Sequence, residues 1–440
     1  MRKDWIECEY QDLLDYEQPT NYIVESTNYR DEYKTPVLTA GKSFIKGYTN
    51  ETNGIFQNLP VIIFDDFTTA TKYVNFQFKV KSSAMKILKP TSELVNMKLT
   101  YYYMQIDSVH NETHKRFWIS IYSKKQLPLP PLPEQKAIVA KIEQLFSDLD
   151  NGIANLKKAQ EQLKTYRQAV LKKAFEGELT KEWRKANNIN IEDNFVKNLT
   201  EIGTILTGNT PSKKKSEYYS SKEYPFYKPT DLNAGNNVFN SIDGLSELGF
   251  QNGRIAPASS ILVTCIGATI GKTGLIKKEG CFNQQINAIV PFKENNPEFI
   301  FYQAISVEFQ NQIKAKASAT TLPILNKGKF SKLTMIIFPL QEQQQIVQEI
   351  ETRLSVCDNA EVNIKSALEK AESLRQSILK KAFEGKLLTE KELEEVRNDP
   401  EWEPAEKLLE RIQAEKAKNV KSKKRKKNET LRMVKDLRNG

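Results

Sequence analysis

The segment PLPEQKAIVAKIEQLFSDLDNGIANLKKAQEQLKTYRQAVLKKAFEGEL, residues 131–179, decides the architecture because the chain contains it twice. It returns as PLQEQQQIVQEIETRLSVCDNAEVNIKSALEKAESLRQSILKKAFEGKL, residues 339–387, without a gap and at an offset of 208 positions. About half of the paired residues are identical. Each copy begins with proline and closes near glycine, which favour the start and the end of a helix. The chain therefore consists of two similar halves, each a globular segment followed by a long helix.

Apolar residues recur at alternating steps of three and four in both copies, the pattern of a coiled-coil seam. Each copy predicts a helix of about 42 residues, about 63 Å long at the usual rise per residue. Because one apolar stripe is unstable in water, each helix needs a partner, and we expect the other copy, running antiparallel. The residues predicted to pair the helices are Ile142, Leu145, Leu149, Leu156, Leu163, Tyr166, Val170, Ile350, Ile364, Leu374 and Ile378.

Antiparallel pairing would place the two globular segments at opposite ends of a rod whose length sets their separation. A plain spacer or dimerisation coil without a measuring role is the alternative. Short β-rich runs separated by turn residues dominate both globular segments, which predicts an α+β fold for each. Strands are expected at 35–38, 60–64, 73–79, 83–88, 260–266 and 286–292, and a helix at 297–315. The boundaries are a first domain at 1–130, a helix at 131–180, a linker at 181–193, a second domain at 194–338, a helix at 339–388 and a charged, basic tail at 389–440.

Composition is that of an ordinary globular protein. The 440 residues are 39% hydrophobic and 27% charged, enough for two or more domains with buried cores. The first residues are acidic and mixed rather than typical of a signal peptide, and the apolar runs are too short to cross a membrane. The four cysteines form no CxxC pair, which is typical of a reduced, cytoplasmic protein.

The net charge of +10 favours a polyanionic partner. The run KSKKRKK at 421–427 contributes six of the positive charges, and a solvated tail is the alternative interpretation of that run. The rest of the chain is still mildly basic, which permits nucleic-acid binding without establishing it.

Three apparent catalytic or metal motifs fail on their chemistry. The stretch GATIGKT at 267–273 has three residues between its glycines, whereas a phosphate-binding loop needs four, so a glycine-bounded turn is expected. The stretch HNETH at 110–114 has its glutamate misplaced for a zinc protease and is expected to be a surface loop. Asp65 and Asp66 have no counterpart in the second half, which favours a turn over a metal site. With two histidines in the chain, we expect no catalytic residue and no metal site.

Ordered motifs in the second half resemble those of the specificity (S) subunit of type I restriction-modification systems, and the resemblance covers nearly the whole chain. The motifs are TGNTPS at 207–212, YPFYKPTDL at 224–232, ILVTCIGATIGKTGLI at 261–276, CFNQQINAIVP at 281–291 and LPILNKGKFSKLTMIIFPLQEQ at 322–343. The repeated helices match as well, and residues 403–418 resemble a C-terminal extension of this family. The first half departs from the pattern and has no obvious TPS element.

The resemblance implies two target-recognition domains on an antiparallel coiled coil with pseudo-two-fold symmetry. Such a subunit reads two unlike DNA half-sites and directs adenine-N6 methyltransferase subunits, and restriction subunits where they exist, to that bipartite target. It implies no chemistry and no cofactor on this chain. S-adenosylmethionine is expected on two partner methyltransferase (M) subunits, and ATP and Mg on a restriction (R) subunit. A coiled-coil scaffold without DNA specificity is the alternative function.

Loops with mixed polar and basic residues are the candidates for contact with double-stranded DNA. Amide side chains suit adenine, and lysines suit guanine or phosphate. In the first domain the candidates are Lys42, Ser43, Tyr48, Thr68, Thr69, Lys72, Lys79 and Lys81. In the second domain they are Thr207, Asn209, Thr210, Ser212, Lys213, Lys214, Lys215, Lys272, Gln284 and Gln285.

Overall fold

The chain forms two compact units, each assembled around part of both long helices. The computed structural model describes residues 2–39, 43–106, 117–189, 196–318 and 322–439, the last seventeen of these by backbone alone. The first unit comprises residues 1–155 and 367–440, and the second comprises residues 156–366. No helix among the described residues is long and apolar enough to cross a membrane.

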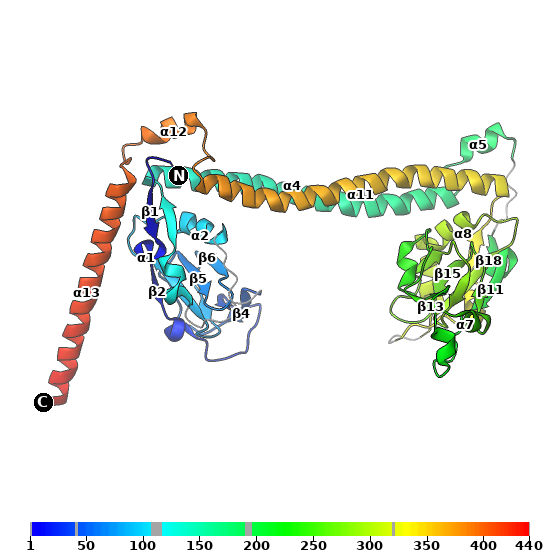
Figure 1. Ribbon diagram of the computed structural model, residues 1–440, viewed down its shortest axis with the longest axis horizontal. Coiled ribbons are helices and arrows are strands. Elements are labelled where there is room, and N and C mark those ends of the chain that lie inside the picture. The colour runs from blue at the N-terminus through cyan, green and yellow to red at the C-terminus, as the bar shows by residue number, and fades with distance from the viewer. Residues whose placement is uncertain (1, 40–42, 107–116, 190–195, 319–321, 440) are drawn as a thin grey trace. The chain divides into compact units, whose positions relative to one another are not determined.

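The first domain is built from short strands in small sheets (Figure 1). Strand β1 (Ile6–Glu9) pairs antiparallel with β9 (Gln126–Leu129), directly before the first long helix. A four-stranded antiparallel sheet has the order β2–β8–β5–β6, with β2 at Leu14–Glu17, β8 at Met85–Pro90, β5 at Val61–Asp65 and β6 at Thr71–Val74. A second sheet has the order β4–β3–β7, with β4 at Ile45–Thr49, β3 at Thr35–Leu38 and β7 at Lys79–Val80. The helices of this domain are α1 (Tyr10–Leu13), α2 (Met97–Ile106) and α3 (Phe117–Ser120).

The second domain repeats this topology although its sequence differs. Its four-stranded sheet has the order β11–β18–β15–β16, with β11 at Gly203–Thr207, β18 at Ile286–Pro291, β15 at Ile261–Thr264 and β16 at Thr273–Leu275. The smaller sheet has the order β13–β12–β17–β14, with β13 at Asp243–Leu245, β12 at Tyr224–Tyr227, β17 at Gly280–Phe282 and β14 at Ile255–Ala256. Strand β10 (Val196–Asn198) pairs with β19 (Thr334–Ile336), as β1 pairs with β9. The short helices are α6 (Leu199–Ile202), α7 (Glu247–Gln251) and α10 (Lys327–Phe330).

Two elements of the second unit differ from the sequence predictions. The helix expected at 297–315 is interrupted, giving α8 (Pro297–Ala304) and α9 (Val307–Lys316). Ser306 caps α9 by accepting a hydrogen bond from the Phe309 amide, so the polar residue ends one helix and begins the next. The expected linker also contains a helix, α5 (Lys181–Ala186), whose Arg184 is buried.

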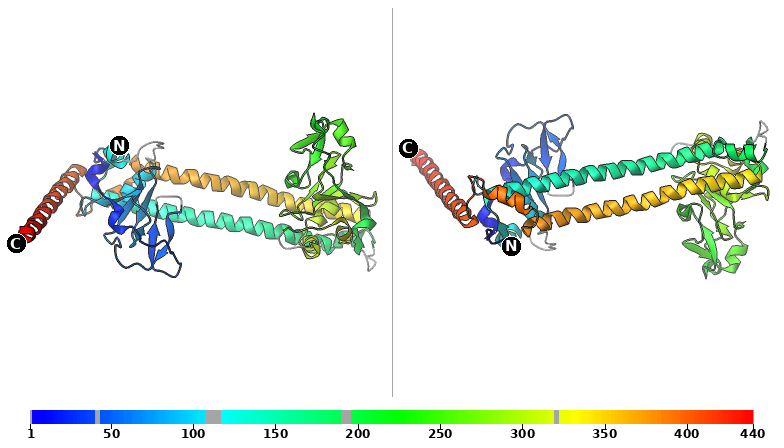
Figure 2. Two further views of the ribbon diagram at one scale, coloured as in Figure 1. Left: turned by 90° about the horizontal axis from the view of Figure 1, so that it is seen from below. Right: turned by 90° about the horizontal axis from the view of Figure 1, so that it is seen from above.

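The repeated sequences form helices of 44 residues each, α4 (Leu132–Phe175) and α11 (Leu340–Phe383). In the first unit, Ile142 of α4 shares a core with Ile378 and Ala382 of α11. In the second unit, Val170 of α4 shares a core with Ile350 of α11. Within each unit the helix portions run antiparallel, side by side (Figures 1 and 2). The fold prediction of two α+β domains with an antiparallel helix pair is confirmed.

Two residues predicted to pair the helices lie outside the seam. Tyr166 and its repeat equivalent Leu374 are 47% and 51% exposed. A strict alternation of three and four averages 3.5 residues per turn and drifts by about 20° per heptad on a straight helix, so 24 residues after the starting isoleucines these two side chains have rotated toward solvent. Val170 and Ile378, four residues further on, are still covered by the cores of the two units. The residue directly after each exposed one faces the partner helix instead: Arg167 donates to Asp358 at 2.6 Å and Arg375 pairs with Asp150. The other nine predicted pairing residues are buried or half-buried.

A buried glutamate and an arginine join the start of one long helix to the end of the other within each unit. In the second unit Arg184 pairs with Glu342 and donates to the Gly177 carbonyl at 2.6 Å. In the first unit Arg2 lies 3.9 Å from Glu134 and donates to the Gly385 carbonyl at 3.4 Å. Both glycines have positive φ, 73° and 71°, the conformation that ends a helix. The repeated PEQ/QEQ and FEG motifs therefore encode one helix-end clamp twice.

The tail folds onto the first unit. After α12 (Glu390–Arg397), the helix α13 (Ala405–Asn439) buries Leu408 and Ile412 in the core that also contains Trp118 and Tyr122. Polar contacts add to this packing, including Asn419 to the Thr91 carbonyl at 3.3 Å and Lys141 to Glu392 at 2.9 Å. The part of the tail before the basic run therefore belongs to the first unit.

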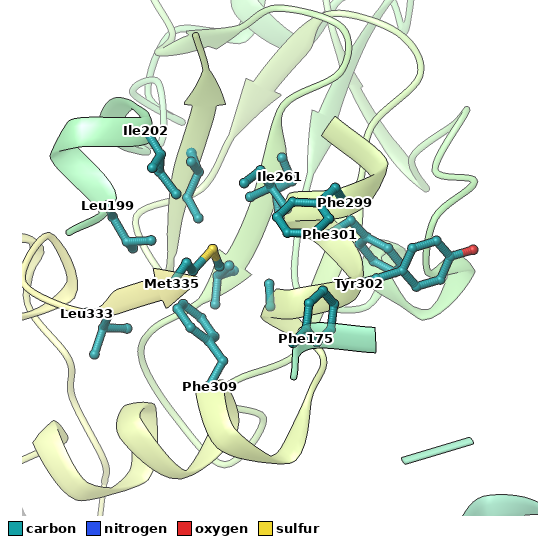
Figure 3. Close-up of a cluster of buried hydrophobic side chains, with 14 of the residues drawn as sticks. Phe175, Leu199, Ile202, Ile261, Phe299, Phe301, Tyr302, Phe309, Leu333 and Met335 are labelled. Atoms are coloured by element: carbon teal, nitrogen blue, oxygen red, sulfur yellow. The ribbon is translucent and has the colours of Figure 1, made fainter. Parts of the chain in front are cut away.

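The core of the second unit joins the long helices to the domain (Figure 3). Phe175 of α4 meets Phe299 of α8 edge to face, with ring centroids 5.5 Å apart. Phe309, Leu333 and Met335 belong to the same cluster. Burial of these side chains fixes the domain on its helices and so positions the loops at its surface.

Candidate nucleic-acid interface

A polar cavity of about 760 Å³ lies in the second domain. Four residues proposed from the sequence as DNA contacts line it, namely Thr210, Lys213, Gln284 and Gln285. They come from two motifs that are more than 70 residues apart, the TGNTPS loop after β11 and the turn between β17 and β18. Sequence reasoning missed the other lining residues, which are Ser216, Tyr219, Phe226, Lys228, Asp243 and Asn283.

Close backbone contact holds the two loops together. The Gly208 amide donates to the Ile286 carbonyl at 3.1 Å, and the Asn209 amide donates to the Phe282 carbonyl at 3.0 Å. A Cβ at Gly208 would lie 2.2 Å from the Asn283 carbonyl oxygen. Glycine is therefore required at this position because a side chain would separate the two loops.

The turn at 283–286 is held at several backbone points. The Ile286 amide donates to the Asn283 carbonyl at 3.1 Å, and the Asn283 amide donates to the Tyr227 carbonyl at 3.1 Å. The Cys265 amide of the neighbouring loop donates to the Gln285 carbonyl at 2.7 Å. The side chains of this turn therefore project from a fixed backbone.

Charges of both signs line the cavity. Lys228 donates to Asp243 at 2.5 Å, and its ammonium lies 5.6 Å from the centre of the Phe226 ring. The hydrogen bond from Lys228 lowers the pKa of Asp243, and Lys213 adds to the effect. Since the carboxylate is already paired, the remaining exposed lysine charge leaves the cavity suited to an anionic partner.

The other second-domain candidates surround the cavity or support its loops. Thr207 donates to the Asn287 side chain at 2.7 Å, and Asn209 accepts from the Arg254 amide at 2.6 Å. Lys215 donates to the Tyr218 hydroxyl at 3.0 Å, while Ser212 and Lys214 are exposed beside it. Lys272 is half-buried at the end of the turn between β15 and β16.

The first-domain candidates are distributed over several elements. Ser43, Thr68, Lys72 and Lys81 are exposed, and Tyr48 is half-buried on β4. Two candidates are corrected by their burial. Lys79 is 3% exposed, pairs with Glu51 at 2.7 Å and donates to the Asn53 carbonyl, so it stabilises the domain. Thr69 is buried in the turn after β5 with a φ of 58°. Lys42 lies outside the described residues.

The rejected catalytic motifs have structural roles where they are described. Asp65 begins a turn, accepting from the Phe67 amide at 2.9 Å, and Asp66 pairs with the buried Lys86 at 3.1 Å. Residues 267–273 form the turn from β15 into β16, with Gly267 and Gly271 at φ values of 100° and 88°. Both turn predictions are confirmed. His110 and His114 lie outside the described residues, and no metal-binding cluster occurs within them.

Some of the missed cavity residues had a signal in the sequence. Phe226 and Lys228 belong to the YPFYKPTDL motif, and Asn283 belongs to CFNQQINAIVP. Asp243 and Tyr219 reach the cavity through pairing of β12 with β13 and packing of the loop before β12, which no local pattern indicates.

Comparison with known proteins agrees with this architecture. The family model for the type I restriction modification DNA specificity domain matches residues 2–163 and 191–370. The specificity subunit of the Escherichia coli type I restriction enzyme EcoR124I/EcoR124II is 34% identical over 366 residues, covering 78% of this chain and 86% of that protein. The EcoKI specificity subunit of Escherichia coli strain K12 is 30% identical over 307 residues, covering 66% and 64%.

Solved structures share the fold at lower sequence identity. A chain from a study of complex assembly and conformational transition of the type I restriction-modification system has a TM-score of 0.65 at 17% identity, covering 88% of this chain and 99% of that one. The HsdS subunit from Thermoanaerobacter tengcongensis has a TM-score of 0.54 at 16% identity, covering 88% and 98%. Two matched specificity domains, the repeated helices and the curated relatives together establish that this chain belongs to the family of DNA specificity subunits of type I restriction-modification systems.

Proposed function

We propose that this chain reads a bipartite, asymmetric DNA target, one half-site with each domain, and directs adenine-N6 methyltransferase subunits to it. The observation that carries the proposal is one topology presented twice with unlike surface loops. The second domain offers the TGNTPS loop and the polar cavity, whereas the first offers other residues on its corresponding strands. Two different reading surfaces suit two different half-sites.

The long helices give this proposal a measuring element. Half-sites about one helical turn, or about 34 Å, apart present their major grooves on the same face of the duplex. Helices of 44 residues supply a spacing element of fixed length for two such sites. Lysine and arginine contacts with phosphates would supply much of the affinity and its salt dependence, and base-edge contacts would supply discrimination.

The chemistry of the system is proposed to lie on partner subunits. Two methyltransferase subunits would carry S-adenosylmethionine, and restriction subunits would use ATP and Mg. Within the described residues the four cysteines are buried, and burial raises the pKa of Cys8, Cys265 and Cys281 to about 12, which does not suit a nucleophile. This chain would contribute recognition and assembly.

Genome-wide mapping of N6-methyladenine tests the proposal. Cells expressing this chain with its cognate methyltransferase subunit are compared with cells expressing the methyltransferase alone. We expect a split, asymmetric motif only in the first case. A complex that forms but creates no new motif would instead support a coiled-coil scaffold without DNA specificity.

A further inference from the structure

Gln285 lies in the cavity of the second domain with its side-chain amide held in one orientation. Asn283 is 7% exposed and sits two residues earlier in the same turn. Its Nδ2 donates to Gln285 Oε1 at 3.0 Å. The Gln285 backbone amide donates to Asn283 Oδ1 at 3.2 Å. The two residues therefore form a closed pair of hydrogen bonds.

The backbone bond decides which way both amides face. A main-chain N–H can only donate, so the atom of Asn283 that receives it must be the oxygen. The other atom of that amide is then the nitrogen, which donates to its neighbour. Gln285 must accept this bond through Oε1, which leaves its Nε2 group as the donor available to the cavity. The main-chain N–H of Gln285, which can only donate, therefore determines the orientation of both side-chain amides.

Gln284 lacks such a determined orientation. Its Oε1 accepts from the Thr210 hydroxyl at 2.5 Å. Because a hydroxyl can donate or accept, the same contact would survive rotation of the Gln284 amide. Of the two neighbouring glutamines, Gln285 is therefore the one whose hydrogen-bonding character is fixed by the protein.

A fixed N–H₂ donor discriminates among base edges in the major groove. A group that only donates can bridge the two acceptors of guanine, N7 and O6, and finds a single acceptor, O4, on thymine. Bidentate recognition of adenine needs an amide that accepts from N6 while it donates to N7. The oxygen of Gln285 is already engaged by Asn283, so the adenine arrangement is disfavoured. This result refines the general expectation that amide side chains suit adenine.

We propose that Gln285 is a specificity-determining residue that donates to a guanine in the half-site read by the second domain, with Asn283 as its positioning residue. The inference rests on the proposed function, since it needs DNA at the cavity. Lys213, on the same cavity wall, would provide phosphate attraction without base discrimination. The rigid turn means that the donor is in place before DNA binds, which reduces the entropy cost of recognition.

Two substitutions should replace the donor that residue 285 presents to the cavity with an acceptor, each in a different way. Gln285→Glu replaces the amide with a carboxylate, which can only accept. Asn283→Asp keeps the acceptor for the backbone amide but replaces the Nδ2 donor with a second acceptor. The Gln285 amide would then rotate to donate to the new carboxylate and present its oxygen to the cavity. Both changes should move the preference at the same single position from guanine toward cytosine or adenine, whose amino groups donate.

The experiment maps the methylated motif for the wild type and both variants in the presence of the cognate methyltransferase subunit. Binding of the purified complex to duplexes that differ at that one position gives the magnitude. We expect guanine discrimination to fall roughly five- to hundredfold, the range typical of one good base contact. The other positions and the first half-site should be unchanged. The matched control is Gln251→Glu, which adds the same negative charge at an exposed position on α7 of the same domain and should leave the motif intact.

The outcomes separate this inference from the function on which it rests. If the wild-type complex produces no motif and binds no duplex specifically, the proposed function fails. If the wild type reads a split motif but Gln285→Glu leaves every base preference unchanged, the assignment of Gln285 is overturned. If Gln285→Glu changes one position and a folded Asn283→Asp variant does not, Asn283 has no positioning role.

Discussion

Arg184→Ala should be among the most destabilising single substitutions in the second unit. The carboxylate of Glu342 is completely buried, and Arg184 is its ion-pair partner. The Thr180 hydroxyl donates to the same carboxylate oxygen at 2.7 Å and would remain. Removing one partner of a buried pair leaves an uncompensated charge and typically costs about 3–5 kcal/mol. The Gly177 carbonyl at the end of α4 also loses its donor.

The repeat provides an internal comparison. Arg2 lies 3.9 Å from Glu134 and is more exposed than Arg184. The Arg2 side chain is 18% exposed and its distance of 3.9 Å is near the limit for an ion pair, so this pair contributes less than the shorter, more deeply buried one. Arg2→Ala should therefore destabilise the first unit much less than Arg184→Ala destabilises the second. The double change Arg184→Met with Glu342→Leu should recover most of the loss, because it removes both charges rather than one.

Hydrogen exchange of the full chain in increasing urea, followed by peptide mass spectrometry, measures each unit separately. With a urea dependence of about 3 kcal/mol per molar, a loss of about 3–5 kcal/mol lowers the midpoint of the second unit by roughly 1–1.7 M. Peptides from the first unit serve as the control and should not change. A loss below about 1 kcal/mol for Arg184→Ala, or equal losses for the two arginine variants, would refute the reasoning.

Three further predictions follow from described geometry. Gly208→Ala should abolish reading of the second half-site but spare the first, because the alanine Cβ would collide with the Asn283 carbonyl of the neighbouring loop. Methylation mapping tests this prediction, and an unchanged motif would contradict it. Burial raises the pKa of Glu134 in the folded state, so the folded protein loses stability as pH rises through that raised pKa. Glutamine does not titrate, so the free energy of unfolding of Glu134→Gln relative to the wild type should be higher at pH 7 than at pH 5, as measured by urea unfolding. One helical turn added to both α4 and α11 should lengthen the DNA spacer that is tolerated, and altered half-sites would contradict the measuring role.

The long helices and their pairing could be predicted because they depend on the spacing of apolar residues along the chain, and this spacing occurs in both copies of the repeat. The prediction failed at Tyr166 and Leu374, where drift of a straight helix accumulates beyond what a strict heptad pattern allows. The burial of Arg184 could not be predicted from the polar connector around it, because it depends on an ion pair with Glu342, which lies far along the chain. The first domain's likeness to the second is a matter of strand order, which sequence motifs do not report.

The candidate site was predictable only in part for a related reason. Motif loops identified Thr210, Lys213, Gln284 and Gln285, because polar residues in glycine-containing loops stand out locally. The direction in which an amide faces depends on hydrogen bonds to a neighbour and to the backbone, and these appear only with coordinates. The sequence therefore identified four residues that line the cavity, but it suggested adenine for amide side chains, whereas the contact proposed for Gln285 is with guanine.

The division of the chain between the units has a consequence for its synthesis. The second unit is contiguous, residues 156–366, so all of its contacts are available once that stretch has left the ribosome. The first unit also needs residues 367–440, including Leu408 and Ile412 of its core. The domain that is translated first is therefore completed last. Until then the apolar core of that domain is incomplete, and exposed apolar surface makes an incompletely folded chain prone to aggregation.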